Sequence, residues 1–381
     1  SGILGESQAR VAGGLLGKMA SLAAAASAVA RRPHRVLCFD GDGVGPELLR
    51  AARRVLQATG VPVEYQSMDF GHGLAQRTGA PVTEEHLVAF ERTRCVLKGP
   101  ITIPPGGGGE AVLRGRRYTS ANQVFRKAFN LFANVRPAVY LPGSGARFEG
   151  TDIVVVRENT EGAYSGEEEM DGPDTAITKK RVTRGASMRI AQFAFEYAVQ
   201  HGRRLVTAVH KANVHQKTDG LFLECCRQVA KSYPGIRYSE QLADSLLTAM
   251  VLDPTAWDVL LCENMYGDLV SDLAAGLIGG LGLAPSGQYG DGMAVFEPCH
   301  GSAPDIAGKG RVNPTSLLLS ASMMLDFLGE AAAARWVREA VAAVVAGSPA
   351  GKTPDLGGAA DTEGMAAAVA AEVERRRGSA L

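Results

Sequence analysis

Apolar runs and amphipathic segments alternate along most of the chain. An apolar run at 36–39 is followed by a polar turn at 40–47, and Leu48, Ala52 and Val55 then recur at the spacing of one helix face. This order predicts a strand, a turn and a helix. The same unit recurs several times further along the sequence.

Three later apolar runs have no polar face, which is typical of strands that are buried on both sides of a sheet. They lie at 153–156, 205–209 and 259–262. Segments with a helical pattern follow them, at 187–199, 220–232 and 268–277. Because strands alternate with helices, we expect an α/β fold with a mostly parallel sheet.

Length and composition narrow the classes of protein. The chain has 381 residues, which predicts two lobes or one large α/β domain. With 46% apolar residues and a formal net charge of zero, it has no basic surplus to attract nucleic acid or anionic lipid. The apolar run at 20–30 is too short to cross a membrane. We therefore expect no nucleic-acid or membrane partner.

The first 32 residues differ from the rest of the chain. They carry Arg10, Lys18, Arg31 and Arg32 against one acid, Glu6, and they are rich in alanine, serine and glycine. This composition predicts an organelle transit peptide, with a disordered or added leader as the alternative. We expect the mitochondrial matrix as the location, with the plastid and the cytoplasm as alternatives.

Polar and charged side chains follow the buried runs. Arg157, Lys211 and the segment 264–268 each come shortly after one of them. In open parallel sheets, ligands bind beyond the carboxyl ends of the strands. We therefore expect the functional site at these strand ends.

Asp268 and Asp272 are spaced i, i+4 at the predicted start of a helix, so both carboxylates lie on one helix face. Two like charges side by side repel each other unless a cation lies between them, and oxygen ligands of this kind suit Mg²⁺ or Mn²⁺. Asp244 is a plausible third ligand. The alternative is an acid at a helix N-terminus with a solvated neighbour.

Arg126, Arg136 and Arg157 are candidates for binding a polyanionic acid, because guanidinium groups bind carboxylates in bidentate fashion. Each could instead be a surface or interface arginine. Lys211, partly desolvated at a strand end, is a candidate base, and Tyr164 is a candidate proton donor. The alternative for both is a packing residue with a solvated tip.

Two segments rich in small residues are candidates for nucleotide contact. The loop HGSAPDIAG (300–308) is compact and polar, and its small residues allow a nucleotide to approach the backbone closely. The turn GDGVG (41–45) lacks the GxGxxG spacing and has no acidic residue about 20 residues further on at a strand end. We therefore do not interpret this turn as a Rossmann cofactor site.

Nine segments, in this order, resemble the motifs of the isocitrate and isopropylmalate dehydrogenase family. Each motif alone is weak, but the ordered set is specific. The motifs are GDGVGPE (41–47), KGP (98–100), SANQVFRK (120–127), NVRP (134–137), RENTEGAYSG (157–166), HKAN (210–213), NMYGDLVSD (264–272), HGSAPDIAG (300–308) and TPDLGG (353–358).

The resemblance implies the family's two-domain α/β fold with a mixed, mostly parallel sheet, which is not a Rossmann fold. A large domain would combine residues 33–131 and 279–381. Residues 132–278 would form a small domain that holds the dimer contact. The chain would act as a homodimer or a higher oligomer, with a hetero-oligomer as a further possibility.

The resemblance also implies an activity, the oxidative decarboxylation of isocitrate with NAD and Mg²⁺ or Mn²⁺, as in the tricarboxylic acid cycle. The cation would bind Asp268, Asp272 and Asp244 of the partner subunit. Lys211, reaching into the partner's site, would take the hydroxyl proton as hydride passes to nicotinamide. Tyr164 would protonate the carbon that loses CO₂, and an isolated monomer would be inactive.

Substrate and cofactor choice depend on two short segments. Family members that take isocitrate resemble this chain at Ser120 and Asn122, whereas isopropylmalate enzymes carry apolar residues there. NAD-dependent members resemble it at Asp305 and Ile306, where a carboxylate would repel the 2′-phosphate of NADP. Isopropylmalate, homoisocitrate and tartrate remain alternative substrates. Further residues expected to line the cofactor site are Thr102, His300, Gly301, Ser302, Ala303, Pro304 and Asn313.

Some positions depart from the family's pattern. Ile103 stands where threonine is usual, Phe125 and Asn130 replace leucine and aspartate, and Glu263 replaces proline. The rival interpretation is a non-catalytic regulatory subunit, because such subunits replace the metal aspartates with asparagine. All expected metal-binding and catalytic residues are present in this chain, which disfavours that interpretation.

Overall fold

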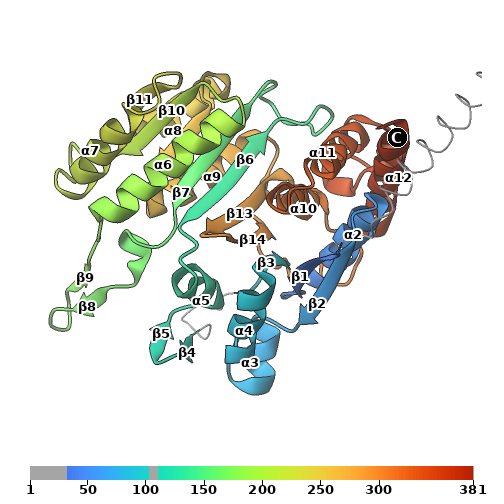
Figure 1. Cartoon of the computed structure of the whole chain (residues 1–381), viewed down its shortest axis with the longest axis horizontal. Coiled ribbons are helices and arrows are strands. Elements are labelled where there is room, and N and C mark those ends of the chain that lie inside the picture. Colours follow the sequence, from blue (N-terminus) through green and yellow to red (C-terminus); the bar gives the residue numbers. More distant parts are fainter. Residues whose placement is uncertain (1–31, 103–109, 381) are drawn as a thin grey trace, which may run out of the picture.

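The computed structural model describes residues 32–102 and 110–380. Residues 1–31 of the predicted transit peptide, and Ile103, lie outside the described residues. The main feature is a ten-stranded sheet with the order β11-β10-β12-β7-β6-β13-β14-β3-β1-β2 (Figure 1). Its strands are β1 (His34–Phe39), β2 (Val63–Met68), β3 (Cys95–Lys98), β6 (Ala133–Val139), β7 (Asp152–Glu158), β10 (Leu205–His210), β11 (Arg237–Leu242), β12 (Val259–Cys262), β13 (Pro285–Gly290) and β14 (Met293–Pro298).

Most neighbouring strands of this sheet run parallel. The exceptions lie at its centre, where β13 is antiparallel to both β6 and β14, and β6 is antiparallel to β7. The sheet is therefore mixed and mostly parallel, as expected. The apolar runs predicted as strands at 153–156, 205–209 and 259–262 lie within β7, β10 and β12.

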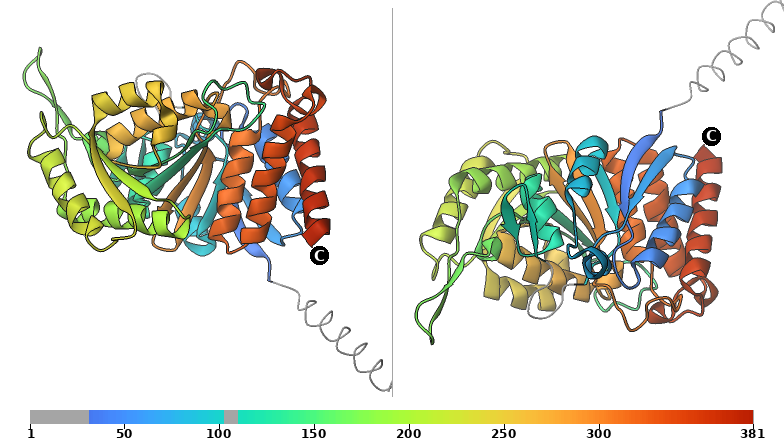
Figure 2. Two further views of the ribbon diagram at one scale, coloured as in Figure 1. Left: turned by 90° about the horizontal axis from the view of Figure 1, so that it is seen from above. Right: turned by 90° about the horizontal axis from the view of Figure 1, so that it is seen from below.

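Helices cover both faces of the sheet (Figure 2). They are α2 (Gly45–Ala58), α3 (His72–Thr78), α4 (Glu84–Thr93), α5 (Ala121–Ala128), α6 (Arg184–Gln200), α7 (Thr218–Ala230), α8 (Ala243–Leu252), α9 (Asn264–Leu277), α10 (Thr315–Phe327), α11 (Ala331–Ala346) and α12 (Thr362–Ala380). Val154 and Val156 of β7 pack in the core cluster with α6, whereas Ile153 and Val155 pack in the cluster with α9. This alternation along one strand explains why the run at 153–156 has no polar face.

The helix predicted at 268–277 begins earlier than expected, at Asn264. Glu263 is its N-cap, and the carboxylate of Glu263 accepts a hydrogen bond from the backbone N–H of Tyr266 at 3.4 Å. Because this cap follows β12 directly, the helix starts at the end of the strand. Asp268 therefore lies in the second turn of α9 and not in the first.

The strand order bears on the predicted domains. Strands from residues 132–278 lie together on one side of the sheet, so the predicted boundary falls between β6 and β13. The largest core cluster, however, contains side chains from both segments, such as Leu48 and Ile153. The division into two domains stays a prediction.

Two short hairpins lie outside the main sheet. They are β4 (Ala111–Leu113) with β5 (Arg116–Tyr118), and β8 (Glu168–Met170) with β9 (Ala176–Thr178). Among the helices of the described residues, none is long and apolar enough to cross a membrane.

Candidate active site

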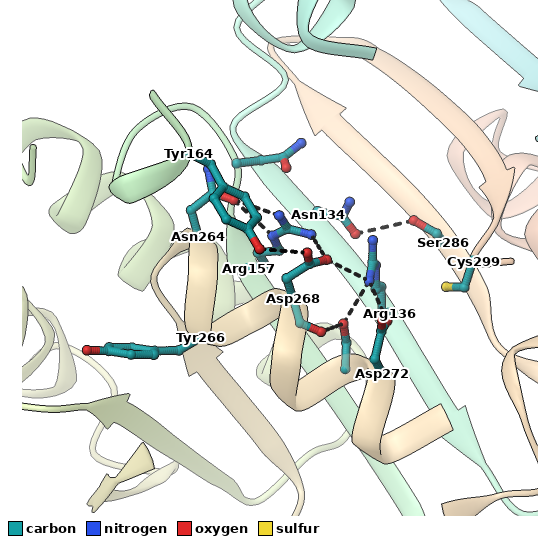
Figure 3. Close-up of polar contacts among 12 residues, drawn as sticks. Asn134, Arg136, Arg157, Tyr164, Asn264, Tyr266, Asp268, Asp272, Ser286 and Cys299 are labelled. Carbon is teal, nitrogen blue, oxygen red and sulfur yellow. Dashed lines mark hydrogen bonds and ion pairs between the residues drawn. The ribbon is translucent and has the colours of Figure 1, made fainter. Parts of the chain in front are cut away.

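Charged side chains meet where α9 passes β6 and β7 (Figure 3). Arg157 Nη1 donates to Asp268 Oδ1 at 2.5 Å, and Arg136 Nη1 donates to the same oxygen at 3.3 Å. Arg136 also donates to Asp272 Oδ1 at 3.2 Å and to Ser271 Oγ at 2.8 Å. The structure thus brings two predicted substrate-binding arginines and two predicted metal-binding aspartates into one cluster.

Burial sets the electrostatics of this cluster. Arg157 is 2% exposed, and burial together with the nearby Arg136 and Arg126 lowers its pKa to about 9, although Asp268 opposes the shift. Burial also raises the pKa of Asp272, against the opposing effect of Arg136. At neutral pH the Arg157 guanidinium is therefore still charged, and its counterion is the carboxylate that it touches.

Tyr164 lies over the same cluster. Its hydroxyl donates to Asp268 Oδ2 at 3.2 Å, and its ring centroid lies 5.6 Å from the guanidinium carbon of Arg157. Burial and the negative charge of Asp268 raise the pKa of the phenol, so it holds its proton at neutral pH. A protonated, partly exposed phenol at this position can donate a proton, which is the role predicted for it.

Asn264 and Gly267 of α9 hold Arg157 in place. Both lie in the segment 264–268 where the site was expected, but no individual role was predicted for either. Asn264 Oδ1 accepts hydrogen bonds from Arg157 Nε at 3.0 Å and Nη2 at 2.7 Å. A Cβ at Gly267 would lie 2.5 Å from Cγ of Arg157, so the arginine can cross the helix because this residue has no side chain. The local sequence does not reveal their partner, because Arg157 lies on a distant strand.

An open cleft of about 380 Å³ lies beside Tyr164, and Ser120 and Arg126 also line it. Ser120 is the N-cap of α5, where its Oγ accepts a hydrogen bond from the backbone N–H of Gln123 at 3.2 Å. This leaves the hydroxyl proton of Ser120 able to donate to a ligand. Asn122 does not line the cleft, but its Oδ1 is buried without a partner in the described chain.

Behind Arg126 lies a buried polar network that the motifs did not reveal. Gln288 Oε1 accepts from Arg126 Nε and from Asn159 Nδ2, each at 2.9 Å, and its amide nitrogen donates to Glu297. Glu297 also pairs with Lys98. Each charged group of this network has a hydrogen-bond or ion-pair partner. The network therefore fixes Arg126 at the cleft and leaves no buried charge unpaired.

Lys211 and Asp244 form a separate pair, with Nζ and Oδ1 2.6 Å apart. Asp219 Oδ2 accepts a hydrogen bond from the backbone N–H of Lys211 at 2.7 Å. Within the described residues, no three histidine, cysteine, aspartate or glutamate side chains gather into a group that could hold a metal ion. One chain therefore brings Asp268 and Asp272 together but not Asp244.

The 300–308 loop packs against the glycine-rich turn around Val44. The carbonyl of Ser302 accepts from the backbone N–H of Val44 at 2.9 Å, and the hydroxyls of Ser302 and Thr102 are 2.6 Å apart. A Cβ at Gly43, whose φ is +58°, would lie 1.9 Å from the Ser302 carbonyl oxygen. The glycine of this turn therefore serves the packing of two loops.

A model of the isocitrate/isopropylmalate dehydrogenase family matches residues 35–369. The chain belongs to this family. The isocitrate dehydrogenase of Methylococcus capsulatus has the same fold, with a TM-score of 0.84, 42% sequence identity, and coverage of 90% of this chain and 99% of that one. The family resemblance and the expected fold class are thereby confirmed.

Similar members of the isocitrate/isopropylmalate dehydrogenase family differ in substrate and in role. The chain is 44% identical to isocitrate dehydrogenase (NAD) catalytic subunit 5, mitochondrial, of Arabidopsis thaliana, over 91% of this chain and 92% of that protein. It is 45% identical to chloroplastic 3-isopropylmalate dehydrogenase of Solanum tuberosum, over 84% and 87%. It is 44% identical to a mitochondrial regulatory subunit of isocitrate dehydrogenase (NAD) from Dictyostelium discoideum, over 85% and 88%.

The family assignment fixes the general chemistry. The family consists of oxidoreductases that decarboxylate hydroxy acids oxidatively, and isocitrate, isopropylmalate and homoisocitrate are all possible substrates for this chain. Its members typically use NAD or NADP and a divalent metal, and they act on small molecules as dimers or hetero-oligomers.

The side chains present fit these groups. Asp268 and Asp272 offer carboxylate oxygens on one helix face, which are the donors that Mg²⁺ and Mn²⁺ prefer. Asp305 is exposed and, in the described part of the chain, has no hydrogen-bond or ion-pair partner, so its carboxylate is available to ribose hydroxyls. Asn313 Nδ2 donates to Asp355 at 2.9 Å and its Oδ1 accepts from the backbone N–H of Thr315 at 2.9 Å, which orients the amide, and its cofactor contact stays a prediction.

The remaining predicted cofactor residues lie around the same loop. His300 Nδ1 is 2.9 Å from the carbonyl oxygen of Gly301, and burial lowers the pKa of the imidazole, which is therefore neutral at pH 7. Ala303 has a positive φ of 39°, Pro304 is exposed, and Ile306 packs against the core. The loop is thus anchored on its inner side and open on its outer side.

Proposed function

We propose that this chain is a catalytic subunit of an NAD-dependent isocitrate dehydrogenase, which forms 2-oxoglutarate and CO₂ with Mg²⁺ or Mn²⁺. The observation that supports this most directly is the cluster of Arg136, Arg157, Asp268 and Tyr164 beside the cleft that Arg126 lines. Three guanidinium groups suit a tricarboxylic acid, and the carboxylates of α9 suit a divalent cation.

The lining of the cleft favours isocitrate over isopropylmalate. Ser120, Lys127 and Thr160 are among its polar side chains, and Ala163 is the one aliphatic side chain among the described lining residues. A third carboxylate would find hydrogen-bond donors there, whereas an isopropyl group would find little apolar surface to bury against.

Each side chain then has a chemical task. A cation held by Asp268 and Asp272 would supply Lewis-acid stabilisation of negative charge on the substrate, and NAD held beside the 300–308 loop would supply the hydride acceptor. Arg136 and Arg157 exchange their aspartate partners for the carboxylates of the substrate. Lys211 takes the proton of the substrate hydroxyl, and Tyr164 donates its phenol proton to the carbon that loses CO₂.

A second copy of the chain completes the site in this proposal. Within one chain, Lys211 and Asp244 lie apart from the Asp268 cluster. Large apolar side chains are exposed on α8, α9 and the segment after Lys211, and an interface between two copies would remove them from water. They are Val214, Val251, Leu252 and Leu269.

Two further parts of the proposal, the choice of NAD and the catalytic role, each rest on one feature of the chain. The free carboxylate of Asp305 supports NAD over NADP, because it would repel a 2′-phosphate. The complete set of catalytic and metal-binding residues supports a catalytic over a regulatory role.

The mitochondrial or chloroplastic names of the relatives support a location in an organelle, and we propose the mitochondrial matrix. Residues 132–278 form the small domain, and 33–131 with 279–381 form the large one.

The test is an assay of the purified chain with Mn²⁺ that follows the absorbance of reduced nicotinamide. We expect turnover of isocitrate with NAD, and much slower turnover with isopropylmalate, homoisocitrate or NADP. Preferred turnover of isopropylmalate would refute the substrate, and no turnover by a folded dimer would favour a regulatory role.

Two variants of Ser120 separate its substrate contact from its helix cap. Ser120→Asp keeps an N-cap acceptor but turns a negative charge toward the substrate, so kcat/KM should fall about a hundredfold with an unchanged melting temperature. Ser120→Thr keeps both the cap and the hydroxyl donor and is the matched control. Equal activity of the two variants would remove Ser120 from the substrate site.

A further inference from the structure

The outer face of α2 carries a concentration of positive charge that the proposed activity does not use. A surface cavity of about 650 Å³ is lined by Arg50, Arg53, Arg54 and Gln57 of α2 and by Tyr65 of β2, among others. The four α2 residues are spaced i, i+3, i+4 and i+7, so they share one face of the helix. We propose that this cavity binds a small-molecule polyphosphate, independently of the reaction at α9.

The positive charge of this face has little compensation within the described chain. Glu363 of α12 lies 3.7 Å from Arg50 and 3.9 Å from Arg54, which is beyond hydrogen-bond distance. Arg377, also on α12, has no ion-pair partner among the residues that the structure describes, and a Cβ at Gly60 on the cavity wall would lie 2.5 Å from its Nη1. The helices α2 and α12 lie side by side (Figure 1), so their arginines add to one another.

Neighbouring side chains fix the position of Arg53 at the wall of the cavity. Its Nη2 donates to Ser67 Oγ at 2.7 Å, and its guanidinium lies 5.1 Å from the ring centroid of Tyr65. Its Nε is buried, and the guanidinium also contacts the Cys38 thiol, where it opposes the rise in thiol pKa that burial causes. Ser67 and Tyr65 thus fix the guanidinium of Arg53 at the wall of the cavity, where its charge adds to that of the other two arginines of α2.

The chemistry of the cavity selects phosphate groups. Guanidinium forks pair with phosphate oxygens in bidentate fashion. Arg50 and Arg54 are like charges at i, i+4, and their mutual repulsion is relieved by a ligand with several negative charges. The cavity is larger than a single orthophosphate requires, and Val61 and Val63 give it an apolar edge for an organic group.

Isothermal titration calorimetry with inorganic pyrophosphate tests the proposal on the full chain. Arg50→Gln/Arg54→Gln is expected to weaken binding at least about tenfold, because two charge-assisted contacts are lost. Arg335→Gln removes an exposed arginine of α11 whose nearest carboxylate, Glu339, is 4.0 Å away, and it should leave the affinity unchanged. Since these side chains are exposed, each variant should keep the wild-type melting temperature.

Glu363→Gln should change the affinity for pyrophosphate in the opposite direction. It removes the carboxylate nearest to Arg50 and Arg54 across the helix pair, so the affinity for pyrophosphate should rise about threefold at low ionic strength. No measurable binding to the wild-type chain would overturn the proposal. Equal binding by wild type and the double arginine variant would do the same, because pyrophosphate would then be bound elsewhere, for example at the 300–308 loop. Weaker binding by Glu363→Gln would also contradict it.

Discussion

Replacing Gly267 with alanine tests whether α9 is shaped around Arg157. On helix propensity alone, alanine is more favourable than glycine by about 1 kcal/mol, so the change should stabilise the protein. In this structure, however, the new Cβ would lie 2.5 Å from Cγ and 2.7 Å from Cβ of Arg157. Carbon atoms pack at about 3.5–4.0 Å, so the arginine or the helix must move by about 1 Å.

The size of the effect follows from the contacts of Arg157. Its guanidinium donates two hydrogen bonds to Asn264 and one to Asp268. A hydrogen bond to a charged group contributes about 1.5–3 kcal/mol, and overpacking costs about 1–3 kcal/mol. After the gain in propensity, overpacking and the loss of one such bond together leave a net destabilisation of about 1.5–5 kcal/mol. A displacement of about 1 Å at a positioning group can cost about a hundredfold in kcat/KM.

Urea unfolding at a fixed protein concentration and steady-state kinetics with isocitrate measure the two effects. The matched control is Gly276→Ala on the same helix, where a Cβ would meet no atom within 4 Å. This control should keep full activity and gain up to about 1 kcal/mol in the free energy of unfolding. If Gly267→Ala behaved like the control in both assays, the steric argument would be wrong. If it were destabilised but fully active, Arg157 would have no role in binding substrate.

Three further predictions concern proton transfer, a site shared between two copies, and pH. Tyr164→Phe should keep the melting temperature and lower kcat about 10²–10⁴-fold, and steady-state kinetics would check this. Lys211→Met and Arg157→Gln chains should each be inactive alone. In a co-refolded equal mixture, half of the dimers contain one chain of each kind and therefore one intact site out of two, so about a quarter of wild-type activity should return. No recovery of activity would contradict a shared site. Nδ1 of His86 accepts from the Thr83 N–H at 3.2 Å, and burial lowers the His86 pKa. The unfolded chain therefore binds more protons below pH of about 6.5, so the free energy of unfolding should fall on acidification below that value, and His86→Gln should flatten this dependence in urea titrations.

The amino-acid sequence by itself determined the local elements and the types of side chain at the candidate site. The apolar runs at 153–156, 205–209 and 259–262 became strands because residues of one strand meet both faces of the sheet, which leaves no polar side. The ordered motifs also indicated the family. Helix α9 begins at Asn264, four residues before its predicted start, because Glu263 caps the helix at the end of β12.

Contacts between distant segments were decided by the tertiary structure. The pairing of Arg136 and Arg157 with the aspartates of α9 joins strands and a helix more than a hundred residues apart in sequence. Gln288 and Glu297 look like ordinary strand residues until packing buries them behind Arg126.

The cavity beside the arginines of α2 could likewise not be predicted from the sequence. Their spacing can be read along one helix, but the cavity exists because β2 and the turn after α2 lie beside them. Periodicity is local, because it depends on neighbours within a few residues. The partners of a buried charge are set by which elements pack together, and no short stretch of sequence contains that information.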